Sequence, residues 1–502
     1  MTLAADEIIM ALDSLLSGQQ CAAPVQGPLF KSIRVLDALS SMPKTLVDTL
    51  HRHFLQDGKL HPAFRAKTIA ERHAQHAAAM LALDSAVCNL HDPPQCCDVA
   101  IVGAGLAGLA VACELTKEGI GGLAIFEKSA SVGGVWRWQG NPLSRVNSSE
   151  PGYRLAITRR HSTNHNTNHS YSYEILDDCR TALEEHRLGE RLFLNAGVRA
   201  VCPAIQPDSW TLQGTRLSAI EFRCVVKQTV VLCLNRRLGV PRYVAYPGEE
   251  NFGGWIRRGL AGDVADVQWA GREVVVVGMG AFAVEQTRTA LECGAARVEL
   301  LVRRHGLVCP QIIDYLNFVR PFTARLEHLT SGSTTMVHFW RTAYKSSGAS
   351  QPESWQDGWF RPDGHTVSVS DMWFVGHFLD VISTSVDTIS SFTHDGLRTS
   401  RGTLLAAQVC IKSIGFEIQA TNEQILGRSG MRANGMVQKN LWAVFEQHLD
   451  VESNNLPFAS YVNATNFSAK VIAQSWKDSA FYDELQRLPL PIKQMNKLTA
   501  AE

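Results

Sequence analysis

The sequence predicts an α/β protein with two dinucleotide-binding units and a helical N-terminal extension. The main observation is a repeated pattern. An apolar strand, a glycine-rich turn, a helix and a second strand follow one another from Asp98, and the same order recurs from Arg272 to Arg304. Such units form parallel sheets joined by crossover helices. The second observation is that residues 1–95 lack this pattern and show helical spacing instead.

The composition of the 502-residue chain excludes several classes of protein. Hydrophobic residues make up 45%, and 48 basic residues balance 48 acidic ones, which argues against wholesale disorder and against nucleic acid as the main partner. No apolar run reaches the roughly 18 residues of a membrane span, and the N-terminus lacks the basic start of a secretory signal. We therefore expect a cytoplasmic protein with reduced thiols, since its 12 cysteines include no C-x-x-C motif.

The N-terminal extension, residues 1–95, contains two helical patterns. Apolar residues from Ile8 to Leu16 recur at helical spacing, and the run from Pro62 to Leu83 is rich in Ala, Arg, Gln and Glu. Neither run carries recognisable chemistry. We expect a role in packing or oligomerisation, and a homodimer would fit such an extension.

The first unit carries a candidate site for a dinucleotide. A G-x-G-x-x-G motif, formed by Gly103, Gly105 and Gly108, follows the apolar strand VAIV and begins a helix. The first glycine allows a tight turn, the second lets a pyrophosphate approach the backbone, and the third lets the helix pack close to the strand. The helix N-terminus favours the anion. Glu127 comes about 20 residues later, the spacing of an acceptor for a ribose hydroxyl.

Further residues extend this first site. Lys128 stands next to the acidic residue, and a second glycine pair, Gly133 and Gly134, precedes Trp136 in the sequence SASVGGVWRW. The paired glycines would let the backbone approach a large ligand, with the tryptophan as an apolar wall. An ordinary turn is the simpler alternative, but the position directly after the acidic residue favours a ligand.

The second unit carries a G-x-G-x-x-A motif after the strand EVVVV, formed by Gly278, Gly280 and Ala283. Alanine is an accepted residue at the third position. At the corresponding strand end, Arg303 and Arg304 replace the acidic residue of the first unit. Because a basic residue there accommodates a 2′-phosphate, the motif favours NADP(H) over NAD(H). The alternative is that the two arginines form a solvated surface pair.

In this order the motifs resemble those of the class B flavoprotein monooxygenases, which include flavin-containing, Baeyer–Villiger and N-hydroxylating monooxygenases. The resemblance covers about residues 97–470. The segment VNSSE is similar to the family's T-N-T-S-K segment, which implies that Asn147 lies beside the flavin, although Glu150 replaces the lysine. The segment IKSIGFE from Ile411 resembles the stretch that follows the family's NADPH domain.

One family fingerprint, F-x-G-x-x-x-H, is matched only in part. Phe252 and Gly254 fit it, but Arg258 stands at the histidine position. The ketone-oxidising branch of the family depends most on this fingerprint, so the departure favours oxygenation of nitrogen or sulfur. The arginine could supply charge near the pyridine nucleotide, and a surface position is the equal alternative.

The resemblance implies both the domain order and the cofactors. An FAD-binding domain of residues 96–235 and 401–490 would contain an inserted NADPH-binding domain, residues 236–400, with an aromatic-rich insertion. NADPH would reduce FAD, and the reduced flavin and O2 would form a C4a-(hydro)peroxide that transfers one oxygen atom to a small organic substrate. We expect Asn147 and Arg258 to act in catalysis, and no metal is implied.

Other functions stay open on the residues alone. An NADPH oxidase that releases hydrogen peroxide, or a Baeyer–Villiger enzyme, would use the same motifs, and an inactive flavin-binding protein is disfavoured by the intact motifs. A disulfide reductase would need a redox cysteine pair, and only Cys96 and Cys97 are close in sequence. His161, His165 and His169 have helical spacing for a metal, but HSTNHNTNHS is poor helix material and favours a polar loop.

Overall fold

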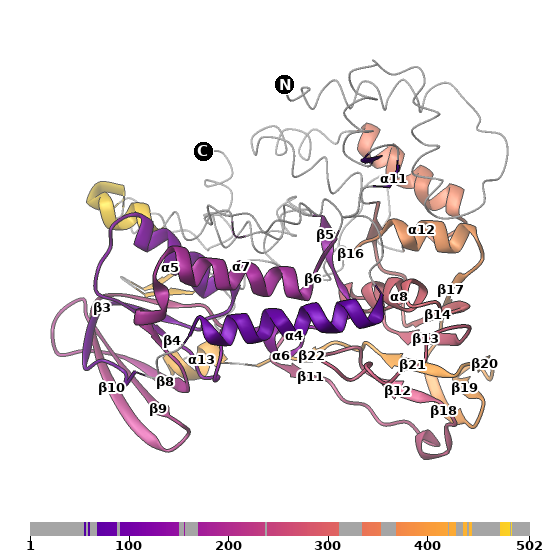
Figure 1. Cartoon of the computed structure of the whole chain (residues 1–502), viewed down its shortest axis with the longest axis horizontal. Coiled ribbons are helices and arrows are strands. Elements are labelled where there is room, and N and C mark those ends of the chain that lie inside the picture. Colours follow the sequence, from indigo (N-terminus) through magenta and orange to yellow (C-terminus); the bar gives the residue numbers. More distant parts are fainter. Residues whose placement is uncertain are drawn as a thin grey trace.

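The computed structural model describes residues 55–56, 59–60, 68–87, 91–149, 155, 169–235, 238–310, 334–352, 368–419, 421–427, 435–438, 441–443, 472–481 and 483. In this part of the chain two sheets lie side by side, and a long helix runs across the junction between them (Figure 1). Several residues named in the sequence analysis lie outside the described ones, namely Ile8–Leu16, Glu150, His161 and His165, as do Trp355 and Trp359 of the aromatic-rich insertion.

The first sheet has eight strands, six of them in the order β23-β24-β10-β3-β4-β7. Neighbours from β24 to β7 pair in parallel, whereas β23 joins β24 antiparallel. The strands of this path are β3 (Cys96–Val102), β4 (Leu123–Phe126), β7 (Leu192–Phe193), β10 (Ile220–Leu232), β23 (Gly435–Gln438) and β24 (Leu441–Ala443).

Alternate residues of β3 face two different layers, as the period of a strand requires. Val99 and Ile101 join the core that helices α5 (Leu106–Lys117) and α7 (Ser172–Glu185) cover. Ala100 and Val102 face the opposite layer. That layer contains helix α13 (Thr421–Leu426) and the strands β8 (Ala196–Pro203) and β9 (Trp210–Arg216). Strand β8 pairs antiparallel with β9, and β9 pairs antiparallel with β10.

The second sheet has five strands, all parallel, in the order β12-β21-β13-β14-β17. Helices α8 (Ala281–Glu292) and α12 (Asp371–Phe378) cover one face, and a small antiparallel sheet covers the other. The strands of the five-stranded sheet are β12 (Trp255–Arg257), β13 (Glu273–Val277), β14 (Arg297–Val302), β17 (Ile382–Val386) and β21 (Val409–Lys412). Those of the small antiparallel sheet are β18 (Ile389–Thr393), β19 (Gly396–Thr399) and β20 (Leu404–Ala406).

The predicted α/β fold with two Rossmann-like units is thus confirmed. The strand pairing also bears on the boundary at residue 400. Because β21 lies between β12 and β13, the second sheet extends past that boundary. The chain crosses between the units twice, and the crossings pair antiparallel as β11 (Val240–Pro241) and β22 (Phe416–Glu417).

The aromatic-rich stretch belongs to the core of the second unit where the structure describes it. Trp340 of α11 (Thr334–Ser347) and Trp373 of α12 are both buried in that core. The indole nitrogen of Trp340 donates to the carbonyl oxygen of Val308 at 2.6 Å. These two tryptophans therefore pack the domain and do not line the cavity described below. Strands β15 (Val308–Cys309) and β16 (Ser368–Val369) pair beside them.

The helix expected at Pro62–Leu83 is present as α4 (Ile69–Ser85), after a short hairpin of β1 (Leu55–Gln56) and β2 (Lys59–Leu60). Its start is set by a capping box, in which Thr68 and Glu71 each satisfy a backbone N–H of the other. The helix packs along α7, and Leu83 is fully buried in the first core. This part of the N-terminal extension is therefore built into the first unit.

Two candidate nucleotide-binding sites

The first glycine-rich turn joins β3 to α5, and its glycines are required by close backbone approach. Gly103 has φ +103°, and a Cβ there would lie 2.6 Å from the carbonyl oxygen of Cys233 in the neighbouring chain segment. A Cβ at Gly108 would overlap the carbonyl oxygen of Gly103. Gly105 is the residue that precedes α5, so the first N–H groups of the helix are next to it.

Glu127 follows β4 and is held against this turn. Its carboxylate accepts hydrogen bonds from the backbone N–H of Ala104 and of Ser129, both at 2.8 Å, and the residue is only 7% exposed. A carboxylate has about four acceptor positions, so two remain for ribose hydroxyls. The adjacent Lys128 has an exposed side chain.

The second glycine pair closes against the first turn. The N–H of Gly133 donates to the carbonyl oxygen of Ala104 at 2.9 Å, and a Cβ at Gly134 (φ +53°) would lie 3.0 Å from the Cα of Gly105. Two backbones thus meet without side chains between them. Trp136 follows in the short helix α6 (Val135–Trp138) and is half-buried. This bare backbone fits a large phosphate-containing ligand such as FAD.

The second glycine-rich turn borders a cavity of about 610 Å³. Gly278 has φ +119°, and a Cβ there would overlap the carbonyl oxygen of Ser413. Gly280 precedes α8 and faces open space, since a Cβ there would meet no atom within 4 Å. Ala283, in the first turn of α8, is fully buried. The turn therefore presents backbone and a helix N-terminus to the cavity, an arrangement that binds phosphate.

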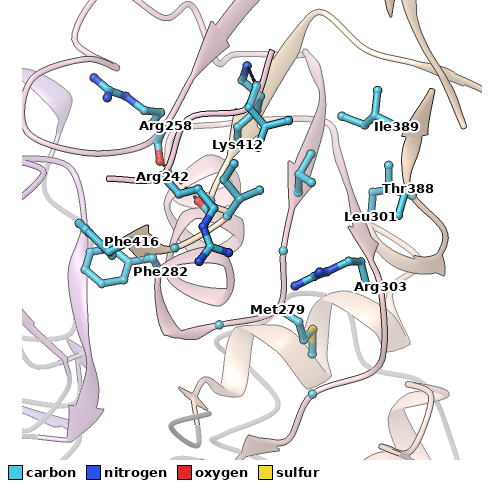
Figure 2. Close-up of a pocket in the computed structure, with 18 of the residues that line it drawn as sticks. Arg242, Arg258, Met279, Phe282, Leu301, Arg303, Thr388, Ile389, Lys412 and Phe416 are labelled. Atoms are coloured by element: carbon cyan, nitrogen blue, oxygen red, sulfur yellow. Dashed lines mark hydrogen bonds between the residues drawn. The ribbon is translucent and has the colours of Figure 1, made fainter. Parts of the chain in front are cut away.

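Basic side chains gather around this cavity (Figure 2). Arg303 directly follows the carboxyl end of β14 and points into it, and Arg304 also lines it. One carboxylate, that of Asp387, is among the lining residues. The cationic lining residues are Arg242, Arg258, Arg303, Arg304 and Lys412. The charge of the cavity thus suits a ligand with several phosphate groups.

Two of these cations, Arg242 and Lys412, lie outside the motifs recognised in the sequence. Arg242 comes from the β11 crossing, and its Nε lies 3.2 Å from a carboxylate oxygen of Glu417 in β22. Lys412 ends β21, is 5% exposed, and donates at 2.8 Å to Glu249 and to the carbonyl oxygen of Val244. The position of Lys412 at the end of the apolar strand VCIK could have indicated a functional role, because a buried lysine is rare unless its charge has a partner.

Asn147 and Arg258 both border the second turn. Asn147 lies on β5 (Arg145–Ser149), which pairs with β6 (His169–Tyr171), and its amide donates to the carbonyl oxygen of Ala281, the first residue of α8. Its Oδ1 is buried without a hydrogen-bond partner. The guanidinium of Arg258 points away from Arg242 and lies near Asp263, and its side chain is 46% exposed.

The described thiols of Cys97 and Cys224 lie close together but far from the first glycine-rich turn. The Sγ atoms of Cys97 and Cys224 lie 3.6 Å apart and both residues are buried. Cys97 is near the start of β3, whereas Gly103 follows the end of the strand, which places the pair about 20 Å from the turn. This position does not suit the redox pair of a disulfide reductase.

The two glycine-rich turns, with a basic cavity at the second, have the geometry of two dinucleotide sites. Residues 101–155 match the family of NAD(P)-binding Rossmann-like domains. A Baeyer–Villiger monooxygenase of Pseudomonas aeruginosa is 28% identical over 38% of this chain and 34% of its own length. The FAD-containing monooxygenase EthA of Mycolicibacterium smegmatis is 24% identical over 67% of this chain and 73% of its own length.

Solved structures agree with this fold. An oxidised steroid monooxygenase bound to NADP is similar with a TM-score of 0.55 at 14% identity, over 76% of this chain and 85% of its own. A polycyclic ketone monooxygenase from Thermothelomyces thermophila has a TM-score of 0.55 at 12% identity, over 82% and 85%. The chain thus resembles class B flavoprotein monooxygenases in sequence and in fold, although it spans only about a third of the length of the first curated relatives.

No helix in the described ranges has the length and apolarity needed to cross a bilayer.

Proposed function

We propose that the protein is a monooxygenase that uses FAD and NADPH to insert one atom of O2 into a small organic substrate, at nitrogen or sulfur. The contact between Asn147 and Ala281 carries the proposal. It joins the strand that leaves the first nucleotide site to the turn of the second. Hydride transfer between two nucleotides requires that their sites meet, and this contact supports a meeting of the two sites beside Asn147.

The residues of the first site would hold FAD. The pyrophosphate would lie at Gly103, Gly105 and Gly108, and the ribose at Glu127. The backbone at Gly133 and Gly134 would face the ligand beside Trp136, with Lys128 at the edge. Bound flavin would supply the reaction with O2, which side chains cannot perform.

The second site would hold NADPH. The backbone at Gly278 and Gly280 would bind the pyrophosphate over the N-terminus of α8, and Arg303 and Arg304 would bind the 2′-phosphate. Arg258, at the rim of the same cavity, would contribute charge near the nicotinamide half. Asn147 would orient the flavin edge through its unpartnered Oδ1, which is a buried acceptor that needs a donor.

The domain order follows from the same assignment. The FAD-binding domain would comprise residues 96–235 and the chain after the second crossing, and the NADPH-binding domain would lie between them. Relatives act on different atoms, since they include the Baeyer–Villiger enzyme above and a phenazine N-monooxygenase of Lysobacter antibioticus. Nitrogen or sulfur is our choice because Arg258 replaces the histidine of the fingerprint.

Anaerobic stopped-flow spectroscopy with NADPH, followed by mixing with O2, tests the proposed function. We expect the flavin absorbance to bleach, and a long-lived band at shorter wavelength than oxidised flavin to appear after O2 is added. Direct return of oxidised flavin with an equivalent of hydrogen peroxide would indicate an NADPH oxidase instead. No bleaching with NADPH or NADH would overturn the proposal.

Removal of the two arginines after β14 should change the coenzyme preference. In a variant with Arg303→Ala and Arg304→Ala we expect KM for NADPH to rise about 10- to 100-fold, because a charge-assisted hydrogen bond contributes about 1.5–3 kcal/mol. KM for NADH should stay unchanged. The matched control is Arg297→Ala, which removes an exposed arginine from the other end of β14. Equal loss with both coenzymes would contradict the assignment of the 2′-phosphate site.

A further inference from the structure

Helix α4 of the N-terminal extension contacts both nucleotide-binding units. In Figure 1 it runs along α7 toward α8. Near its C-terminal end, Asp84 accepts hydrogen bonds from Ser131 at 2.6 Å and from Arg137 at 2.9 Å, on either side of the second glycine pair. At its N-terminal end, Arg72 reaches the second unit.

Arg72 joins three parts of the chain with one side chain and is fully buried. Its Nη1 donates at 2.6 Å to the carbonyl oxygen of Leu143, which lies just before β5 in the chain and whose side chain is buried in the core of the second unit. Its Nη2 donates to a carboxylate oxygen of Glu292 at 2.9 Å, the last residue of α8 in the second unit. A planar guanidinium can make both contacts at once, which a single ammonium cannot do in the same geometry.

The carboxylate of Glu292 is the centre of a buried ionic cluster. Arg145 lies 3.6 Å from it and Arg288 lies 4.0 Å from it. Burial alone would raise the pKa of Glu292, but the neighbouring arginines outweigh burial and hold this pKa below its ordinary value. The carboxylate is therefore charged at neutral pH. Since two arginines remain beside it, loss of Arg72 would not leave the carboxylate unpaired.

Helix α8 forms hydrogen bonds with residues 144–147 from its first residue to its third turn. Asn147 binds its first residue, Gln286 donates to the hydroxyl of Ser144 at 2.8 Å, and Arg288 donates to the carbonyl oxygen of Arg145 at 2.7 Å. The contact with Arg72 is the last of the series. The helix begins at the second glycine-rich turn, so its direction sets where that turn lies relative to β5.

We propose that Arg72 is a positioning residue for hydride transfer, holding α8 and the second glycine-rich turn in register with the first nucleotide site. The proposal rests on the proposed function. It gives α4 a role in the reaction, because the far end of α8 lies about 18 Å from the turn and a small rotation there displaces the nicotinamide site. A displacement of 1 Å can cost about 100-fold in rate.

The test compares three variants of the full-length, FAD-loaded protein: Arg72→Met, Arg72→Lys and the control Arg180→Met. Arg180 on α7 makes its ion pairs with Asp177 and Glu184 of its own helix, so its loss leaves the junction intact. Two properties are measured: anaerobic flavin reduction at increasing NADPH, and hydrogen exchange of the crossings β11 and β22.

For Arg72→Met we expect the limiting rate of flavin reduction to fall about tenfold or more, with little change in the Kd for NADPH or in FAD content. Backbone amides of the two crossings, including that of Arg242, which donates to the carbonyl oxygen of Gly415, should exchange faster, while those of β3 and β13 stay protected. Arg72→Lys should fall between the wild type and Arg72→Met, since it retains the charge but only one of the two contacts. The control should match the wild type in both measurements.

An unchanged limiting rate with unchanged exchange at the crossings would overturn the proposal. So would a uniform rise in exchange across both sheets, because it would show that Arg72 only stabilises the fold. If Arg72→Met does not fold, the same two measurements on Arg72→Lys test the proposal. If NADPH fails to reduce the wild-type flavin, the proposed function is wrong, and the exchange comparison still tests the junction separately.

Discussion

Replacing Gly108 by alanine is expected to abolish FAD binding and to lower the stability of the first unit by about 3 kcal/mol or more. The added Cβ would overlap the carbonyl oxygen of Gly103, which is backbone and has no rotamer to change. Helix α5 must then move away from β3, and the N–H groups at its start move with it. Flavin content of the purified protein and urea unfolding both measure the effect.

The matched control for this change is Gly121→Ala. A Cβ at Gly121 would meet no atom within 4 Å, and its φ is not positive, so the fold accepts alanine there. We expect flavin content and unfolding midpoint to equal those of the wild type. Full flavin content in the Gly108→Ala variant would show that the turn does not hold FAD in the way proposed.

Glu285 is expected to make the protein less stable as the pH rises toward 8. It lies on α8 with 6% exposure, and burial, opposed by Arg288 and by a hydrogen bond from Ser144, raises its pKa from 4.5 to about 8. The folded state therefore keeps a proton that the unfolded chain releases above pH 4.5. The free energy of unfolding therefore falls between pH 4.5 and about pH 8, by up to about 1.4 kcal/mol per pH unit, and levels off above pH 8.

Urea unfolding at several pH values between 6.5 and 8 measures this slope. His76 has the opposite effect at lower pH, because burial lowers its pKa from 6.5 to about 4. Stability therefore rises as the pH increases from about 4 to 6.5, and His76 adds no slope above pH 6.5. In the Glu285→Gln variant we expect a flat profile and higher stability at pH 8. The control Glu221→Gln, at an exposed position of β10, should keep the wild-type slope. An unchanged slope in Glu285→Gln would contradict a buried, protonated carboxyl.

The role of Gly108 can be recognised from the sequence, whereas that of Glu285 cannot. Gly108 is found from local spacing, because a strand, a tight turn and a helix must follow one another within about ten residues to make a phosphate site. Glu285 cannot be found this way. Its hydrogen-bond partner Ser144 is far away in the chain, and a glutamate in a helix with this pattern is expected to face solvent.

The sequence by itself determined the two strand–turn–helix units, the acidic residue after the first and the arginines after the second. These features depend on residues near one another in the chain, so local spacing carries the information. Only the tertiary structure decided that Lys412 and Arg242 reach the cavity of the second turn, that β21 joins the second sheet, and that Arg72 is buried. Arg72 and Glu292 are 220 positions apart, and their contact forms only when both units and α4 have packed, because burial of an arginine needs partners that local sequence does not supply.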